Sequence, residues 1–324
     1  MILVIAGHTI YLGYSFPLYA FHMPLFFFLS GLVFKDKNES FKNYVESKSK
    51  SLLKPWVIMI LISFLICLSI PQWRSALTIK DIVADFYTAN TNTLQNSSLW
   101  YLICYFFVLI LFYLVKRLKF NHKGILLFLI IAFALLWIRE ALELIPLPFH
   151  RMPFKIDSAL IAIVFFLVAF HYKTKILSVA NSKTKWMPVV LVIIISVAGC
   201  VLNGWSNINS LEFGRIRLLY YPIAFLGIAT VCLISKKIST TECGLLKSVL
   251  VFFGKNSLLI FGFQSLFIRL YILLFNNIQG LKMELYGDNP ICHQLGAFVI
   301  VSFVISPMLV ILFKFLRKRN INIL

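Results

Sequence analysis

Long runs of apolar residues restrict the fold of this chain more than any other feature. The runs are about 18 to 25 residues long, the length at which an α-helix crosses the hydrocarbon core of a bilayer with its backbone polar groups satisfied internally. Hydrophobic residues make up 60% of the chain and charged residues only 13%, whereas soluble domains are roughly half apolar and one-quarter charged. The sequence therefore predicts an all-α, polytopic membrane protein. It excludes a soluble enzyme, a disordered chain, a secreted disulfide scaffold and an outer-membrane barrel, whose strands are only about ten residues long and alternate.

The apolar runs predict about ten membrane helices in a single membrane-embedded domain over residues 1–324. The expected spans are 2–13, 19–34, 53–70, 99–115, 124–142, 157–172, 187–205, 218–235, 257–275 and 296–315. The first span is too short to cross a bilayer, so the first helix is expected to be truncated. Residues 79–86 are expected to form an amphipathic helix between the third and fourth spans. No cleavable signal peptide is visible, because the chain opens directly into apolar sequence without a basic leader.

The distribution of positive charge predicts the topology. Of the 31 Lys and Arg residues, 22 lie in segments 35–54, 116–123, 173–185, 236–255 and 314–319, and the alternate segments hold the other 9. Because cytoplasmic loops carry an excess of Lys and Arg, both termini are expected in the cytoplasm. The net charge of +19 then needs no nucleic-acid partner to explain it. The six cysteines have neither zinc-site nor disulfide-framework spacing, and no metal is expected.

Two histidines lie in the first two expected spans, His8 in the first and His22 near the end of the second. An ionisable side chain inside a membrane is a functional candidate by default. Gly7 thins the helix surface beside His8, so that a substrate or another backbone can come close. For His22, an ordinary hydrogen bond to a helix carbonyl stays an alternative.

Further polar groups gather at the face towards which these histidines lie. They are Arg139, Glu140, Glu143, His150, Arg151, Asp157, Arg215, Arg217, Gln264 and Arg269. Glu140 and Glu143 are three residues apart on one helical face, and a solvated rim is the alternative to a catalytic pair. Arg215 and Arg217 are equally consistent with anchors to lipid headgroups.

Lysines cluster at the opposite face. Lys48, Lys50 and Lys54 come just before Pro55, and Lys255 precedes the span that begins at residue 257. Helix N-termini beside lysines attract phosphate groups. A nucleotide or coenzyme A site is therefore one interpretation, and ordinary positive charge of cytoplasmic loops is the other.

At these residues the sequence resembles the integral-membrane acyltransferase family 3, and within it the fucose 4-O-acetylase-like and exopolysaccharide O-acetyltransferase subset. The most specific motif is His22-Met23-Pro24-Leu25-Phe26-Phe27-Phe28-Leu29-Ser30-Gly31. The other matching pieces are Gly7-His8, Leu52-Leu53-Lys54-Pro55-Trp56, Leu99-Trp100-Tyr101-Leu102, Asp157-Ser158-Ala159-Leu160 followed by Phe165-Phe166-Leu167, and Gly254-Lys255-Asn256-Ser257-Leu258. They occur in the family's order over nearly the whole chain, and ten helices is the family's number.

The resemblance implies transfer of an acyl group, most often acetyl from acetyl-CoA, to a hydroxyl of a cell-surface or lipid-linked saccharide. A positioned imidazole suits that chemistry, because its pKa lies near neutrality. His8 is therefore the predicted catalytic residue, either as general base or as acyl carrier. A bacterial cytoplasmic (inner) membrane location is implied, with the bilayer, the acyl-CoA, the saccharide and polysaccharide-assembly proteins as partners.

The same resemblance suggests roles for the other candidates. Asp157 and Glu140 are expected to orient a histidine or to bind sugar hydroxyls together with His22. Trp100 offers an aromatic face to a sugar ring, although a tryptophan at a membrane interface is also an ordinary belt residue. Lys48, Lys50 and Lys255 are the predicted contacts of the coenzyme A phosphates.

Three positions depart from the family pattern. The family carries an arginine eleven residues before the histidine that matches His8, and only seven residues precede His8 here. Arginines usual before the position of Pro55 are replaced by Lys48 and Ser51. A histidine often found late in the family is Gln264.

Two other classes of function stay open from the sequence. A flippase for a lipid-linked glycan, or a small-solute transporter, would use similar polar pockets without chemistry, but the inverted repeat common in transporters is not visible. A non-catalytic membrane partner in a polysaccharide-assembly complex, or an inactive remnant, is the third interpretation.

Overall fold

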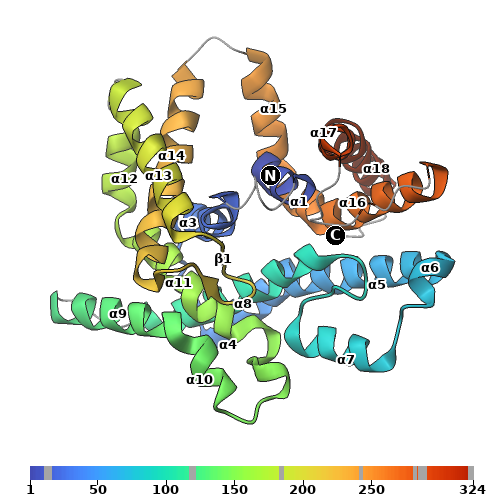
Figure 1. The fold of residues 1–324 in the computed structure, drawn as a ribbon. Coiled ribbons are helices and arrows are strands. Elements are labelled where there is room, and N and C mark those ends of the chain that lie inside the picture. The colour runs from blue at the N-terminus through green and yellow to red at the C-terminus, as the bar shows by residue number, and fades with distance from the viewer. Residues whose placement is uncertain are drawn as a thin grey trace. The chain divides into compact units, whose positions relative to one another are not determined.

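The computed structural model describes residues 1–10, 17–116, 122–181, 186–240, 244–279, 283 and 290–319. This part of the chain is helical almost throughout (Figure 1). Six of its helical segments are long and apolar enough to cross a membrane: Phe41–Ser69, Ser97–Val115, Pro148–His171, Arg217–Thr240, Ser257–Ile278 and Ile291–Lys318. Two shorter apolar helices lie at Pro17–Val33 and Met187–Asn203. The prediction of an all-α membrane protein is confirmed, and the number of ten spans stays a prediction.

The predicted orientation rests on charges that the structure describes only in part. Segments 117–121 and 182–185, which belong to two of the basic loops, lie outside the described residues. The cytoplasmic location of both termini therefore stays a prediction.

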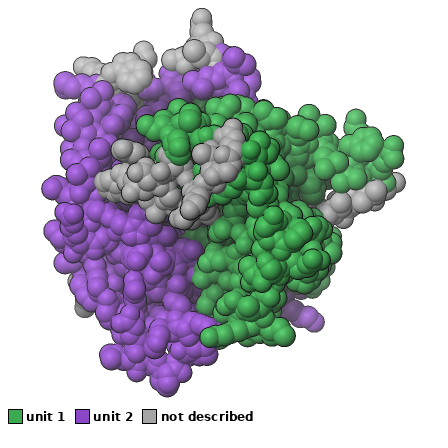
Figure 2. Space-filling view, turned by 45° about the vertical axis from the view of Figure 1, so that its right-hand side comes forward, with its two compact units in different colours: residues 1–15, 46–106, 250–324 green, residues 16–45, 107–249 purple. Residues whose placement is uncertain are grey.

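The chain divides into two compact units (Figure 2). Unit 1 comprises residues 1–15, 46–106 and 250–324, and unit 2 comprises residues 16–45 and 107–249. Three of the four boundaries fall inside helices, namely α4 (Phe41–Lys48), α8 (Trp100–Val115) and α15 (Gly244–Lys255). Each unit is described by itself below.

Unit 1 is built around one long apolar helix, α16 (Ser257–Gln279), which contacts α1 (Ile2–Thr9) and α5 (Lys54–Ser69). Its other helices are α6 (Pro71–Arg74), α7 (Ile79–Thr88), α17 (Ile291–Val299) and α18 (Ser306–Lys318), with π-helical turns at Ser49–Leu53 and Ile300–Ile305. A Cβ atom on Gly262 of α16 would lie 2.3 Å from the sulfur of Met59 on α5. The missing side chain at Gly262 thus lets these two helices approach closely, as small residues do in membrane helix packing.

Unit 2 holds two helix pairs. α3 (His22–Val33) packs along α11 (Ile156–His171), and α13 (Trp186–Asn203) lies beside α14 (Tyr220–Thr240) (Figure 1). A short antiparallel hairpin of β1 (Ser206–Asn207) and β2 (Glu212–Phe213) connects the second pair, with Ser206 opposite Phe213. The other helices are α9 (His122–Ala134), α10 (Ile138–Glu143) and α12 (Lys173–Asn181), with 3₁₀ turns at Leu135–Trp137, Pro148–His150, Pro153–Lys155 and Arg217–Leu219.

The contact between α3 and α11 depends on Gly31. A Cβ atom at this position would lie 2.2 Å from the backbone oxygen of Phe166, which has no flexible end that can move aside. Gly31→Ala is therefore expected to lower the free energy of unfolding by about 1–3 kcal/mol, the usual effect of overpacking. Thermal unfolding of the detergent-solubilised protein measures this change.

Gly254→Ala provides the matched control, because nothing lies within 4 Å of a Cβ atom at Gly254 on α15. Replacement of a glycine inside a helix by alanine stabilises the helix by up to about 1 kcal/mol. Equal melting temperatures for the two variants would show that the α3–α11 contact tolerates a side chain.

The amphipathic helix expected at residues 79–86 is present as α7. Thr78 caps it, accepting a hydrogen bond from the Asp81 backbone N–H at 3.1 Å. Ile79, Val83 and Phe86 are exposed along one side at spacings of four and three residues, which places them on one helical face. That face suits a helix lying in the plane of a membrane surface.

Asp85 of α7 is buried, and its Oδ2 accepts a hydrogen bond from the Thr93 backbone N–H at 2.6 Å. Burial raises the pKa of this carboxyl above its ordinary value of 3.8, because the charged form loses its hydration. The folded chain thus holds the proton more tightly than the unfolded chain. The stability that this provides is complete below about pH 3.8 and is lost as the pH rises through the raised pKa.

We therefore expect Asp85→Asn to melt at a higher temperature than the wild type at pH 8. An uncharged amide keeps the hydrogen-bond acceptor and removes the buried charge. The difference in melting temperature should shrink as the pH is lowered to about 4, where the wild-type carboxyl takes up its proton. A difference that does not change with pH would contradict a raised pKa at Asp85.

Candidate functional site

His8 lies one residue from the end of α1, and its imidazole has a defined orientation. Its Nδ1 is 2.8 Å from the backbone oxygen of Val4, one turn earlier. A carbonyl oxygen only accepts hydrogen bonds, so Nδ1 carries the proton and donates it. In the neutral ring this makes Nε2 the basic nitrogen. The helix thus fixes both the tautomer and the direction of the base.

The polar segment at residues 95–98 is hydrogen-bonded to α16, the helix that packs against α1. Asn96, fully buried, donates from Nδ2 to the backbone oxygen of Gly262 at 2.8 Å and to Oγ of Ser63 at 3.0 Å. Ser98 donates to the backbone oxygen of Phe261 at 3.1 Å, and the hydroxyl oxygens of Ser97 and Ser265 are 2.9 Å apart. Because buried polar groups need partners, these bonds fix the register of α16 against residues 95–98.

The same register places Arg269 near His8. Nη1 of Arg269 donates to Oε1 of Gln95 at 2.8 Å, and the guanidinium is within electrostatic range of the His8 ring. Five residues earlier on α16 lies Gln264, which is 1% exposed. Among the described residues, neither amide atom of Gln264 has a hydrogen-bond partner. Unit 1 thus contains an oriented imidazole, a guanidinium and an unsatisfied buried amide.

The other candidates of unit 1 lie at the beginnings of its spans. Lys48 and Lys50 occur where α4 passes into α5, and Lys255 ends α15 just before α16. Lys50 pairs with Glu46 at 2.6 Å on the surface, an arrangement that adds little stability. Trp100 opens α8, is buried, and meets Tyr101 edge to face at a centroid distance of 6.3 Å. The roles predicted for these four residues in coenzyme A or sugar binding stay predictions.

His22 belongs to unit 2. Its Nδ1 donates to the backbone oxygen of Leu18 at 2.7 Å, and its ring meets Tyr19 edge to face at 4.9 Å. Tyr19 in turn lies 4.6 Å from the ring of Trp205. A hydrogen bond to a helix carbonyl was the alternative to a functional role for His22. The structure contains such a bond, and the carbonyl belongs to the same segment as His22. A substrate-binding role stays a prediction.

Asp157 is buried at the start of α11, where it binds the preceding loop. Its two oxygens accept hydrogen bonds from Nε and Nη2 of Arg151 at 2.6 and 3.0 Å. They also accept from the backbone N–H groups of Ser158 at 2.6 Å and Met152 at 3.2 Å. The chain's own donors therefore satisfy this carboxylate, and the arrangement accounts for its position in the fold.

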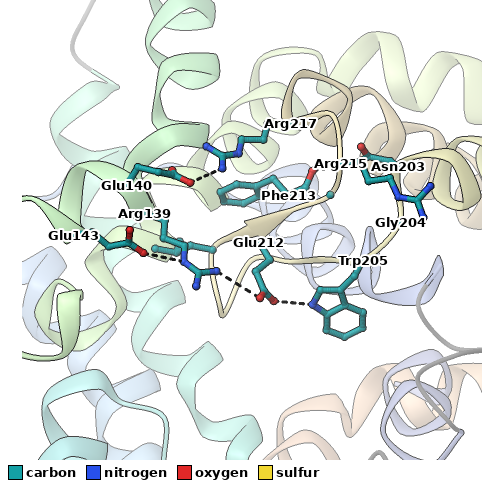
Figure 3. A pocket seen from close by; sticks show the side chains of 12 residues that line it. Arg139, Glu140, Glu143, Asn203, Gly204, Trp205, Glu212, Phe213, Arg215 and Arg217 are labelled. Carbon is teal, nitrogen blue, oxygen red and sulfur yellow. Dashed lines mark hydrogen bonds and ion pairs between the residues drawn. The ribbon is translucent and has the colours of Figure 1, made fainter.

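Glu140 lines a cavity of about 560 Å³ between α10 and the β1–β2 hairpin (Figure 3). Glu140 pairs with Arg217, while Arg139 lies 3.6 Å from Glu143 and 3.5 Å from Glu212. On the far side of Glu212, the indole Nε1 of Trp205 donates to its Oε2 at 2.7 Å. The charges expected as a rim at this face thus line an open pocket within unit 2, and their side chains are half-exposed.

The pocket brings together residues that the sequence places far apart. Glu140 and Glu143, and the two arginines considered as headgroup anchors, Arg215 and Arg217, all line it. Trp205, Glu212 and Asn203 were not expected at the site. The signal available in the sequence was the pair of glycines that flank the hairpin, Gly204 and Gly214, because such glycines mark tight turns. Both have positive φ in the structure.

Comparison with known proteins decides the family. Residues 1–316 match the family model for acyltransferase 3, described as an acyltransferase domain. The chain belongs to the acyltransferase 3 family. The match includes residues of both units, and this acyltransferase is a multi-pass membrane protein. No curated protein and no solved structure matches the chain.

Proposed function

We propose that this acyltransferase moves an acyl group, acetyl in the first instance, from acyl-CoA to a hydroxyl of a saccharide, with His8 as the base. The observation that carries the proposal is the orientation of His8 in a chain of this family. Nδ1 donates to the carbonyl of Val4, which makes Nε2 the basic nitrogen of the neutral ring. A sugar hydroxyl is a poor nucleophile at neutral pH and needs such a base.

The proposed route has two steps, attack of the sugar oxygen on the thioester and loss of coenzyme A. Nε2 of His8 removes the hydroxyl proton as the sugar oxygen attacks the thioester carbonyl. The tetrahedral intermediate collapses with loss of the coenzyme A thiolate, which takes the proton from the imidazolium. The products are the sugar ester and free coenzyme A. Arg269, close enough to act on the charge at His8, is suited to stabilise the developing oxyanion.

Lysines of unit 1 are proposed to hold the donor. Lys48 and Lys50 lie where α4 continues through a π-helical turn into α5, and Lys255 lies just before α16. An ammonium group is a compact positive charge that binds phosphate groups. This supports coenzyme A binding at these positions, through its phosphate groups.

Acetylation of surface glycans tests the proposed function in bacterial cells. Cells that produce the full chain should carry alkali-labile acetyl esters on a purified surface polysaccharide, visible by proton NMR, and cells with the empty vector should not. Membrane vesicles from the same cells serve to measure saccharide flux. Flux without ester formation would overturn the proposal and favour a transporter.

A labelling experiment on the same protein distinguishes a general-base role of His8 from an acyl-carrier role. With radiolabelled acetyl-CoA and no acceptor, an acyl carrier retains label on the chain after rapid acid quench, and a general base does not. The proposed general-base route predicts an unlabelled chain.

A further inference from the structure

The pocket of unit 2 has unused hydrogen-bonding capacity of both kinds. Oε2 of Glu140 is buried in its wall and has no partner among the described residues. Arg139 is 3.5 and 3.6 Å from its two carboxylate neighbours, which is longer than a usual hydrogen bond of about 2.7–3.2 Å. The cavity therefore offers a carboxylate acceptor and guanidinium donors together. Sugar hydroxyls, each both donor and acceptor, match this combination.

The size and composition of the pocket also suit a saccharide. Its volume of about 560 Å³ lies inside the range of roughly 300–1,000 Å³ typical of small-molecule sites. The polar groups come from α10 on one side and from the hairpin on the other, and Trp205 adds an aromatic wall (Figure 3). An apolar ligand would leave Oε2 of Glu140 without a hydrogen-bond partner.

Arg215 distinguishes this pocket from a neutral sugar site. Arg217 is paired with Glu140, and Arg139 is shared by Glu143 and Glu212. Within the described part of the chain, Arg215 is exposed, and it is the only charged side chain lining the pocket that has no ion-pair partner of opposite charge. A guanidinium binds a carboxylate through two parallel hydrogen bonds.

The backbone holds Arg215 in place. Its N–H donates to the backbone oxygen of Asn203 at 2.6 Å, and the Asn203 side chain accepts from the Ile216 N–H at 2.8 Å and donates to the oxygen of Phe213 at 3.1 Å. Gly214 has φ +81°, and a Cβ atom there would lie 2.2 Å from Nδ2 of Asn203. The turn before Arg215 is thus locked by Asn203, which reduces the ordering needed when a ligand binds.

We infer that this pocket binds a saccharide unit that carries a carboxylate, with the acid on Arg215 and the ring hydroxyls on Glu140 and Arg139. The assignment of this saccharide as the acyl acceptor rests on the proposed function. Its binding to the pocket does not.

Titration calorimetry on the full chain in detergent tests the inference. The probes are a tetrasaccharide with one glucuronate and the matching tetrasaccharide with glucose in its place. The wild type is expected to bind the acidic probe at least about tenfold more tightly, the effect of hydrogen bonds to a charged group. Arg215→Gln should remove that preference and leave the affinity for the neutral probe within about twofold.

Arg74→Gln is the control, because Arg74 is an exposed arginine of unit 1 with no part in the pocket. It should bind both probes as the wild type does. The inference is overturned if the wild type binds the two probes equally, if it binds neither, or if Arg215→Gln keeps the preference. It is also overturned if phosphatidylglycerol micelles displace the acidic probe, since the site would then belong to a lipid headgroup.

His8→Ala separates this inference from the proposed function. The variant should bind the acidic probe with unchanged affinity, since His8 is not among the residues that line the pocket. A wild-type chain that binds the acidic probe but acetylates no saccharide would leave the pocket standing and the proposed function refuted.

Discussion

Replacement of His8 by alanine is expected to lower kcat/KM for acyl transfer at least about 100-fold. A positioned general base accelerates proton transfer by roughly 10²–10⁴-fold, and His8 is held for that task by its bond to Val4. The substitution removes one half-buried ring from a helix end, so the fold should persist. The rate of ester formation by membranes with equal amounts of each protein measures the effect.

His150→Ala is the matched control for this variant. His150 is an exposed histidine at the end of the Pro148–His150 turn in unit 2, and its loss should change the rate less than about twofold. If His8→Ala kept a tenth of the wild-type rate or more, His8 would not be the base.

Asp157→Asn is expected to lower the free energy of unfolding by about 3–5 kcal/mol. The change leaves the guanidinium of Arg151, only 15% exposed, without its charge partner, and loss of one member of a buried ion pair has this magnitude. It also weakens the bonds that Asp157 accepts from the backbone at Met152 and Ser158. The loop between α10 and α11 should loosen, and the melting temperature in detergent should fall accordingly.

Asp36→Asn is the comparison for Asp157→Asn. Asp36 pairs with Lys116 at 2.7 Å, but its side chain is 38% exposed, and a pair of this kind contributes about 1 kcal/mol or less. Equal losses in the two variants would contradict the structural role of Asp157.

Helix positions were largely predictable, because the length and apolar content of each run specify a membrane helix on their own. The run expected at 53–70 is α5 at Lys54–Ser69, and the run expected at 187–205 is α13 at Trp186–Asn203. The hairpin at Ser206–Phe213 was not predicted. Its strands are two residues long, and no alternation of polar and apolar residues is visible over so short a segment.

The candidate site was predictable in its residue types and not in its pairings. A histidine in an otherwise apolar segment, such as His8, is unusual enough to be found from sequence alone. The contact of Asn96 with Gly262 joins residues 166 positions apart, and only the folded chain specifies it. The pairing of Glu140 with Arg217 likewise required the positions of α10 and the end of the hairpin.

Release of the coenzyme A thiol tests the central claim most directly. Purified full-length wild type and His8→Ala are incubated with acetyl-CoA, with and without a membrane-glycan extract, and free thiol and sugar ester are measured together. The proposed function predicts thiol release that requires the glycan, equals the ester formed, and falls at least about 100-fold in His8→Ala. Release that is independent of the glycan or of His8 would contradict it.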